Sequence, residues 1–328
     1  MKNIKLAVSL GDPAGIGPEV VLKAFRLLPK PARNCLTVFG DLAYFEELNR
    51  STGSGVRVID SRAAKRADDG LRVLPLLEMG FKRQDFGKVS KKMGAAAMVS
   101  LEVAAAATLD GEYDALITPP IHKKAVNLAG YHIPGHTEFL AEMCGDIPVA
   151  MMLASPNLKV VVATTHVAVK DVPGALDSAK LAGLMTIIDG SMKRMTGKRP
   201  TIAVCGLNPH ASDQGLFGDE EKRIIAPAIT IAKRKGMKVS GPYPADTMFT
   251  PRALEKYDVA LAMYHDQGLI PVKALGFGKT VNITLGLPIL RVSVDHGAAF
   301  DIAGKNLADG APMAHAIMTA ISILRGRF

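Results

Sequence analysis

Short apolar runs and longer helical patterns alternate along the chain. The first run, Ile4–Leu10, ends at Gly11-Asp12-Pro13, and Pro18 then opens a helical pattern that continues through Leu28. Further strand-like runs are predicted at residues 35–40, 114–118, 149–154, 159–164, 201–205, 259–263 and 281–285. Helical patterns lie at about residues 94–109, 174–196, 218–236 and 311–325. This alternation predicts an α/β fold with mostly parallel sheets covered by helices on both faces.

Size and composition are those of an ordinary soluble globular protein. The 328 residues predict about two domains, at roughly 150 residues each. An apolar fraction of 48% with 22% charged residues excludes disordered, collagen-like and disulfide-scaffold classes. No apolar run reaches the ~18 uninterrupted residues that span a bilayer, so no membrane partner is expected. The three cysteines, Cys35, Cys144 and Cys205, lack metal or disulfide spacing, which predicts a cytoplasmic protein.

The chain is basic, and the charge is unevenly distributed. The formal net charge is 40 − 31 = +9, and residues 61–92 contribute nine Lys or Arg against four Asp or Glu, or +5. Basic proteins attract nucleic acids, membranes or small anions. Aromatic residues make up only 5% of the chain and Trp is absent, so stacking on nucleic-acid bases is disfavoured. A small anionic substrate is therefore the expected partner, and nucleic acid is not.

A glycine-rich turn joins the first predicted strand to the first helix. In Leu10-Gly-Asp-Pro-Ala-Gly-Ile-Gly-Pro-Glu19 three glycines precede a helix that starts near Pro18. Such a turn can bring a ligand to backbone amides at a helix N-terminus, but a tight structural turn is the commoner role. The spacing differs from the GxGxxG dinucleotide fingerprint.

Three histidines directly follow predicted buried strands. His166, His210 and His265 come after the runs that end near residues 164, 205 and 263. Open α/β sheets place their ligands at these carboxyl ends of strands. Three neutral imidazoles that converge suit a divalent metal ion and leave coordination positions open for a substrate. We favour this interpretation over three unrelated loop histidines.

Other polar residues suit an anionic substrate. Gly135-His136-Thr137-Glu138 precedes an apolar helical pattern, with Thr137 predicted as its N-cap, and the same residues could hold a phosphate or carboxylate. Three further polar residues near the third histidine could bind an anion or simply be solvated: Lys273, Asn282 and Arg291. Asp246 lies in a predicted turn and could act as a general base.

Six ordered motifs carry a family resemblance. They are Gly11-Asp-Pro-Ala-Gly-Ile-Gly-Pro-Glu19, Pro134-Gly-His-Thr-Glu138, Gly206-Leu-Asn-Pro-His210, Met263-Tyr-His-Asp-Gln-Gly268, Val281-Asn-Ile-Thr-Leu-Gly-Leu-Pro288 and Ser293-Val-Asp-His-Gly297. From about residue 5 to 310 the chain resembles the 4-hydroxythreonine-4-phosphate dehydrogenases, the PdxA family of vitamin B6 biosynthesis. The first motif and His296–Lys305 are also similar to the isocitrate and isopropylmalate dehydrogenase superfamily, in which the second segment matches an adenosine-binding loop.

The resemblance implies roles for individual residues. It makes His166, His210 and His265 ligands of one divalent metal ion, which could be zinc, cobalt, manganese or magnesium. It makes His136, Thr137, Lys273, Asn282 and Arg291 substrate contacts. Asp295, His296, Gly297 and Asp301 would bind the NAD or NADP cofactor. Asp246 and Lys123 are the candidates for the general base. A homodimer is implied, with the site in an interdomain and dimer-interface cleft and the third histidine supplied by the partner chain.

The resemblance also implies a reaction. The C3 alcohol of 4-(phosphooxy)-L-threonine would be oxidised with hydride transfer to NAD(P), and decarboxylation would give 3-amino-2-oxopropyl phosphate. The nearest alternative is a related dehydrogenase acting on 4-phospho-D-threonate or 4-phospho-erythronate. A phosphate acyltransferase of the same fold is a more distant one, and the three histidines argue against it. No family motif falls in residues 61–92, whose role stays open.

The expected architecture is therefore two α/β/α domains of the isocitrate/isopropylmalate dehydrogenase type. No linker marks their boundary, so we place it by where the candidate chemistry clusters. Residues 1–128 and 268–328 are predicted to form a discontinuous cofactor-side domain. Residues 129–267 are predicted to form the metal, substrate and dimerisation domain.

Overall fold

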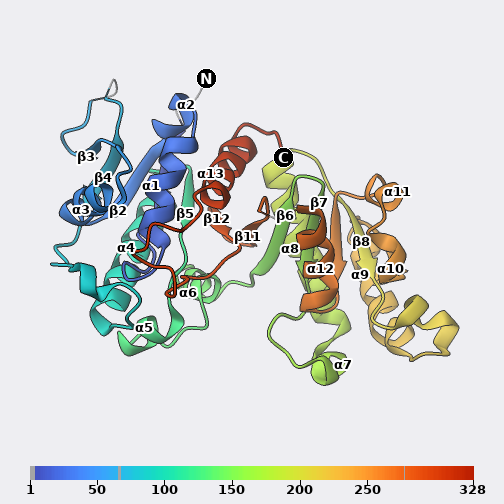
Figure 1. Ribbon diagram of the computed structural model, residues 1–328. Helices are drawn as coiled ribbons and strands as arrows, with labels where there is room; N and C mark the ends of the chain where they lie inside the picture. Colours follow the sequence, from blue (N-terminus) through green and yellow to red (C-terminus); the bar gives the residue numbers. More distant parts are fainter. Residues whose placement is uncertain (1–3, 66–67, 277) are drawn as a thin grey trace. The chain divides into compact units, whose positions relative to one another are not determined.

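The computed structural model describes residues 4–65, 68–276 and 278–328, and these form two compact units (Figure 1). Unit 1 comprises the chain up to Asp146 together with Leu287–Arg325, and unit 2 comprises Ile147–Gly286 with Gly326–Phe328. Unit 1 is discontinuous, and its bounds differ from the boundary drawn from the sequence, because residues 129–146 belong to unit 1 and residues 268–286 to unit 2. The reason is packing: α12 (His265–Gly276) lies against β6 (Ala150–Ser155) and β7 (Leu158–Val162), and β11 (Val281–Leu285) pairs with β6.

Unit 1 is built on six parallel strands in the order β3-β4-β2-β1-β5-β12. Their bounds are β1 Leu6–Val8, β2 Leu36–Gly40, β3 Val58–Asp60, β4 Leu71–Pro75, β5 Ala115–Thr118 and β12 Leu290–Val294. The helices are α1 Gly17–Leu27, α2 Lys30–Arg33, α3 Leu42–Thr52, the 3₁₀ turn η1 Arg83–Asp85, α4 Lys91–Leu109, α5 Lys123–Leu128, α6 His136–Met143 and α13 Ala311–Leu324. Helices α1 and α13 lie side by side in Figure 1 and pack together.

Unit 2 has the strand order β11-β6-β7-β10-β8-β9. Strand β6 runs antiparallel to β7 and β11, while the other four strands are parallel to one another: β7 Leu158–Val162, β10 Val259–Ala262, β8 Thr201–Cys205 and β9 Lys238–Tyr243. The remaining elements are η2 Val169–Asp171, α7 Val172–Ala175, α8 Ser178–Thr196, η3 Pro209–Gly215, the π turn η4 Glu221–Ile225, α9 Ala226–Arg234, α10 Ala245–Met248 and α11 Pro251–Leu254. The predicted α/β class with mostly parallel strands is confirmed.

Local chemistry explains where the elements differ from the sequence pattern. The helix predicted over residues 174–196 is split into α7 and α8, because Asp177 takes an extended conformation and its side chain caps α8 by accepting from Lys180 N–H. Strands β3, β4, β9 and β12 were not predicted. In β12 the polar residues Arg291 and Ser293 interrupt the apolar run, yet both are buried.

Helix α4 is the core helix of unit 1. Within the described residues it is the one helix long and apolar enough to cross a membrane, and 56% of its most apolar window is buried inside the protein. It packs against β1, β2, β5 and α5. A Cβ built on Gly94 would lie 2.1 Å from the carbonyl oxygen of Ala125, so only glycine allows α5 this close.

The basic segment 61–92 is an integral part of unit 1. It contains strand β4, which pairs with β2 and β3. Its aromatic residues Phe81 and Phe86 stack edge to face at 4.8 Å, and Phe81 makes the same contact with Tyr44 of α3. Arg66 and Ala67 of this segment lie outside the described residues. The described part of the segment therefore packs as part of the unit.

Candidate functional site

The glycine-rich turn lies against the segment that resembles an adenosine-binding loop. The N–H of Ile16 donates to the carbonyl of Ala298 at 3.0 Å. A Cβ built on Gly15 would lie 2.7 Å from that same carbonyl oxygen, so glycine is required for the approach. The turn therefore has the structural role that its spacing favoured: it supports the loop that follows β12.

Two neighbouring titratable residues, the buried Asp12 and the half-buried His122, lie next to this loop. The ring of His122 packs on Phe300 with centroids 4.3 Å apart. Burial raises the pKa of Asp12 to about 6, although hydrogen bonding from Ala14 and the charge of His122 act in the opposite direction. Asp12 Oδ2 and His122 Nδ1 are both buried without a hydrogen-bond partner in the described part of the chain. Hydrophobic periodicity does not single out this pair, although Asp12 lies in the Gly11–Glu19 motif.

The three candidate metal ligands follow adjacent parallel strands of unit 2. His166 comes after β7, His265 after β10 and His210 after β8, and β10 pairs with both of the others. All three histidines therefore lie at the same carboxyl edge of the sheet. The rings of His166 and His265 come close within one chain, with centroids 6.2 Å apart.

Two further side chains, Gln267 and Glu221, hold the backbone at this edge of the sheet. Gln267 accepts from Met263 N–H at 2.7 Å and donates to the carbonyl of Gly206 at 2.8 Å, so it ties the end of β10 to the end of β8. The buried carboxylate of Glu221 accepts from the N–H groups of Leu207 and Asn208 at 2.7 and 2.8 Å. Gln267 lies in the Met263–Gly268 motif, and that motif is the sequence signal that could have found it.

His210 lies in an unusual backbone segment. Residues 210–214 all have positive φ, between 44° and 76°, which is one turn of left-handed helix without a glycine. Each L-residue in this conformation costs about 1–2 kcal/mol. Such strain persists where the surroundings fix it and is concentrated at functional sites. The bonds from Glu221 hold the chain directly before this segment.

The histidine chemistry fits a divalent ion. Nδ1 of His265 lies 2.7 Å from the Asp266 carboxylate, which orients the ring and leaves Nε2 to bind an ion. His166 is exposed beside it and offers a second imidazole. Among the described residues of one chain, however, no three His, Cys, Asp or Glu side chains are grouped closely enough to hold a metal ion. One chain thus supplies a pair of neighbouring imidazoles.

Unit 1 carries three of the candidate substrate residues. Arg291 is 2% exposed and donates through Nε and Nη2 to the hydroxyl of Thr118 at 2.9 and 2.7 Å. Burial, and then the charge of Arg291, lower the pKa of His136 well below its ordinary value, so this imidazole is neutral. His136 Nε2 is buried and has no hydrogen-bond partner among the described residues. Thr137 follows His136 in the first turn of α6.

The predicted cap of α6 was wrong. The N-cap is Gly135, not Thr137, and no side chain caps the helix end. Gly135 takes an extended conformation, with φ 178°. Thr137 is thereby placed inside the helix, two residues after the cap.

Unit 2 carries the other two candidate substrate residues. Lys273 is exposed on α12, and Asn282 is half-buried on β11 with its Oδ1 buried and unpartnered among the described residues. Of the candidate bases, Asp246 is exposed on α10, just after the carboxyl end of β9, and Lys123 is exposed at the start of α5 in unit 1. Since β9 is parallel to β8, Asp246 lies at the same sheet edge as the histidines.

Comparison with known proteins identifies the family. The family model described as "Pyridoxal phosphate biosynthetic protein PdxA" matches residues 32–320. The chain belongs to this family. It is 41% identical to a 4-hydroxythreonine-4-phosphate dehydrogenase of Sulfurihydrogenibium sp., over 99% of both chains. It is also 41% identical to a D-threonate 4-phosphate dehydrogenase of Salmonella typhimurium, over 98% of this chain and 100% of that one.

A solved structure agrees with this assignment. The crystal structure of a 4-hydroxythreonine-4-phosphate dehydrogenase from Klebsiella pneumoniae superposes with a TM-score of 0.88 at 38% identity. The match covers 98% of this chain and 99% of that one. The fold is therefore that of the family throughout the chain.

Proposed function

We propose that this chain is a 4-hydroxythreonine-4-phosphate dehydrogenase of pyridoxal 5'-phosphate (vitamin B6) biosynthesis, acting in the cytoplasm. It oxidises 4-(phosphooxy)-L-threonine at C3 with NAD or NADP, and the product decarboxylates to 3-amino-2-oxopropyl phosphate. The observation that carries the proposal is the full-length similarity to such an enzyme. The three histidines at the ends of adjacent parallel strands support it, because this is where open α/β sheets bind ligands.

Different residues of the chain are suited to binding the substrate and the nucleotide. The buried Arg291 guanidinium and the exposed Lys273 ammonium are suited to the substrate's phosphate and carboxylate. His136, held neutral, can donate or accept one hydrogen bond to a polar group of the substrate, as can Thr137 and Asn282. Asp295, His296, Gly297 and Asp301, on the loop supported by the glycine-rich turn, are proposed to bind the nucleotide.

The overall reaction is a two-electron oxidation followed by loss of carbon dioxide. The C3–H bond breaks with its electron pair going to the nicotinamide, and a base takes the hydroxyl proton. In the resulting β-keto acid the bond to the carboxylate breaks, and C2 takes up a proton. Of the two candidate bases we favour Asp246 over Lys123, because Asp246 lies at the histidine edge of the sheet.

His166, His210 and His265 are the residues that would hold a divalent ion. A bound zinc, cobalt, manganese or magnesium ion would supply Lewis-acid stabilisation of negative charge on the C3 oxygen. Asp266 orients His265, and Gln267 ties the strand ends that carry His265 and His210.

We propose further that the enzyme is a homodimer whose metal site takes ligands from both subunits. Large apolar side chains are exposed shortly after each histidine: Val169 at 71%, Leu216 at 72% and Ile270 at 66%. If these side chains gather into one patch, they form the kind of surface that another protein covers. Because His166 and His265 are neighbours within one chain, we favour His210, rather than His265, as the ligand from the second subunit.

Mixing inactive variants tests the dimer site. If His210 crosses the interface, His166→Ala mixed with His210→Ala should regain activity, because one site of each hybrid has three intact imidazoles. Random exchange gives about half hybrids and so about one quarter of wild-type activity. His166→Ala mixed with His265→Ala should stay inactive. Recovery in the second mixture alone would show that His265 crosses instead, and recovery in neither, after demonstrated exchange, would exclude a shared site.

The substrate is tested directly by cofactor reduction. The purified protein is incubated with a divalent metal, NAD or NADP, and either 4-(phosphooxy)-L-threonine or 4-phospho-D-threonate, which has a hydroxyl in place of the amine. We expect faster reduction with the amine-bearing substrate and formation of carbon dioxide. No reduction with either acid would refute the proposed function.

A second candidate is D-threonate 4-phosphate dehydrogenase activity. The observation that favours it is the equal identity, 41%, to the Salmonella typhimurium enzyme of that name. A higher kcat/KM for 4-phospho-D-threonate in the same assay would establish it. This second activity requires the same residues to bind the phosphate and the carboxylate, and its substrate differs from the first in having a hydroxyl in place of the amine.

A further inference from the structure

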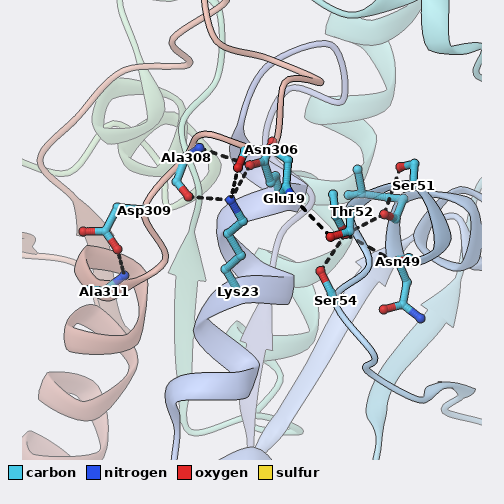
Figure 2. A network of polar contacts seen from close by, with 11 residues as sticks. Glu19, Lys23, Asn49, Ser51, Thr52, Ser54, Asn306, Ala308, Asp309 and Ala311 are labelled. Carbon is cyan, nitrogen blue, oxygen red and sulfur yellow. Dashed lines mark hydrogen bonds and ion pairs between the residues drawn. The ribbon is translucent and has the colours of Figure 1, made fainter.

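A partly buried ion pair on the first helix holds the loop that follows β12. Lys23 and Glu19 lie one turn apart on α1, with Lys23 Nζ 2.8 Å from Glu19 Oε1. The Glu19 side chain is 2% exposed and that of Lys23 is 23% exposed. A partly buried ion pair loses some of its hydration, and bonds to its remaining donors and acceptors offset that cost. Figure 2 shows both side chains aimed at the loop residues Asn306 and Ala308.

The remaining bonds of this pair go to the loop, while Glu19 Oε2 is buried without a hydrogen-bond partner among the described residues. Lys23 Nζ donates to the carbonyl oxygens of Asn306 at 2.9 Å and Ala308 at 2.7 Å, so with Glu19 all three ammonium protons are used. Glu19 Oε1 accepts from Ala308 N–H at 3.1 Å. The two side chains, here called the loop anchor, thus bind both backbone polar groups of Ala308.

The anchored part of the loop needs such support. Asn306 has a left-handed backbone with φ 59°, which is uncommon for a residue other than glycine. Its side chain donates to the carbonyl of Thr52 at 3.2 Å, at the end of α3 (Figure 2). The loop carries no regular helix or strand between β12 and α13. Its conformation therefore depends on the side chains that reach it from α1 and on the bond from Asn306 to the backbone of α3.

The exit of the loop is fitted to Lys23. A Cβ built on Gly310 would lie 2.6 Å from Cβ of Lys23 and 2.7 Å from the backbone nitrogen of Ala24. Only glycine lets the chain pass this close to α1. Two independent features, the bonds of the anchor and the close approach at Gly310, thus fix the same stretch.

We infer that Glu19 and Lys23 are positioning residues for the nucleotide cofactor, acting through the loop 295–310. This rests on the proposed function, in which Asp295, His296, Gly297 and Asp301 of that loop bind NAD or NADP. A loop ordered before binding loses less conformational entropy when the ligand arrives, so the anchor increases cofactor affinity. The hydrogen bonds of the anchor go to the loop and not to Arg291, so we expect substrate binding to stay unchanged.

The test removes the ammonium and keeps the side-chain length. Lys23→Met is compared with Arg26→Met, which removes an equal charge from an exposed position on the same helix. Cofactor Kd is measured by calorimetry, kinetics are measured with each ligand varied, and hydrogen exchange of residues 295–310 is followed without ligand. We expect Lys23→Met to weaken cofactor binding at least about tenfold and to speed exchange in the loop. Its kcat at saturating cofactor and its KM for substrate should match those of Arg26→Met.

Two further variants separate positioning from simple loss of stability. Glu19→Gln keeps an oxygen acceptor for Lys23 and Ala308, so its cofactor affinity should fall less than that of Lys23→Met. Gly310→Ala leaves the anchor residues in place but displaces the loop, so it should raise the cofactor KM as well. Equal cofactor affinity in Lys23→Met and Arg26→Met, with both folded, would overturn the inference. A wild-type protein that binds neither NAD nor NADP would instead refute the proposed function, whatever the exchange data show.

Discussion

Replacing Arg291 with Met tests the substrate assignment most directly. The wild-type guanidinium is 2% exposed and is held by two hydrogen bonds to the Thr118 hydroxyl. Burial lowers the pKa of Arg291 to about 10, and the negative charge of Glu138 acts in the opposite direction. The group is therefore still charged near pH 7, in a site where water screens it little. Methionine removes the charge and the donors but fills similar volume.

The expected magnitude follows from this burial. A hydrogen bond to a charged group contributes about 1.5–3 kcal/mol, and the loss of about 2 kcal/mol corresponds to roughly thirtyfold weaker binding. We expect the substrate KM to rise by at least this factor while the cofactor Kd changes less than about threefold. The charge also lowers the pKa of His136, so the variant should show His136 titrating nearer its ordinary range.

The assay needs two controls. Arg50→Met removes an exposed arginine of the same unit, paired with Glu47 at 2.7 Å, and should change neither constant. Thr118→Val keeps the charge but removes its oriented acceptor, so it should give a smaller rise in substrate KM. Melting temperatures show whether each variant is folded. Equal losses of substrate and cofactor affinity in folded Arg291→Met would refute the assignment.

Three further outcomes are expected. Burial raises the pKa of Asp12 from 3.8 to about 6 in the folded state, so the folded protein binds a proton more tightly than the unfolded chain does. About 3 kcal/mol of unfolding free energy is therefore present at low pH and is lost as pH rises through about 6. Denaturation at about pH 4 and pH 8 should show this loss in the wild type and not in Asp12→Asn. Gly94→Ala should lower the unfolding free energy by about 3 kcal/mol, measured in urea, because the added Cβ would lie 2.1 Å from the Ala125 carbonyl oxygen. A melting temperature equal to that of the wild type would contradict this close packing of α4 and α5. Gln267→Leu should weaken metal affinity by about 10- to 100-fold in a chelator competition, because it removes the two hydrogen bonds that tie the end of β10 to the end of β8. Unchanged affinity would show that Gln267 does not position the metal ligands.

The sequence by itself determined the class of fold and the candidate chemistry. Runs such as Val259–Ala262 are short, apolar and followed by polar residues, which is enough to predict buried strands with ligand-binding residues at their ends. The histidines could be picked out for this reason alone. Hydrophobic periodicity is read from residues that are neighbours in the sequence, and it indicates which of them are buried. It failed where polar residues are buried, as in β12, and where strands are half exposed, as in β3.

Only the tertiary structure decided which of these residues meet. The sheet order places β10 between β7 and β8, which brings His265 next to His166 although 99 residues separate them. The bond from Arg291 to Thr118 spans 173 residues, and that from Lys23 to Ala308 spans 285. Such pairs depend on how the crossover connections fold and on exclusion of water from the core. A local pattern contains neither, so the loop anchor, Gln267 and the Asp12–His122 pair became visible only once the chain was folded.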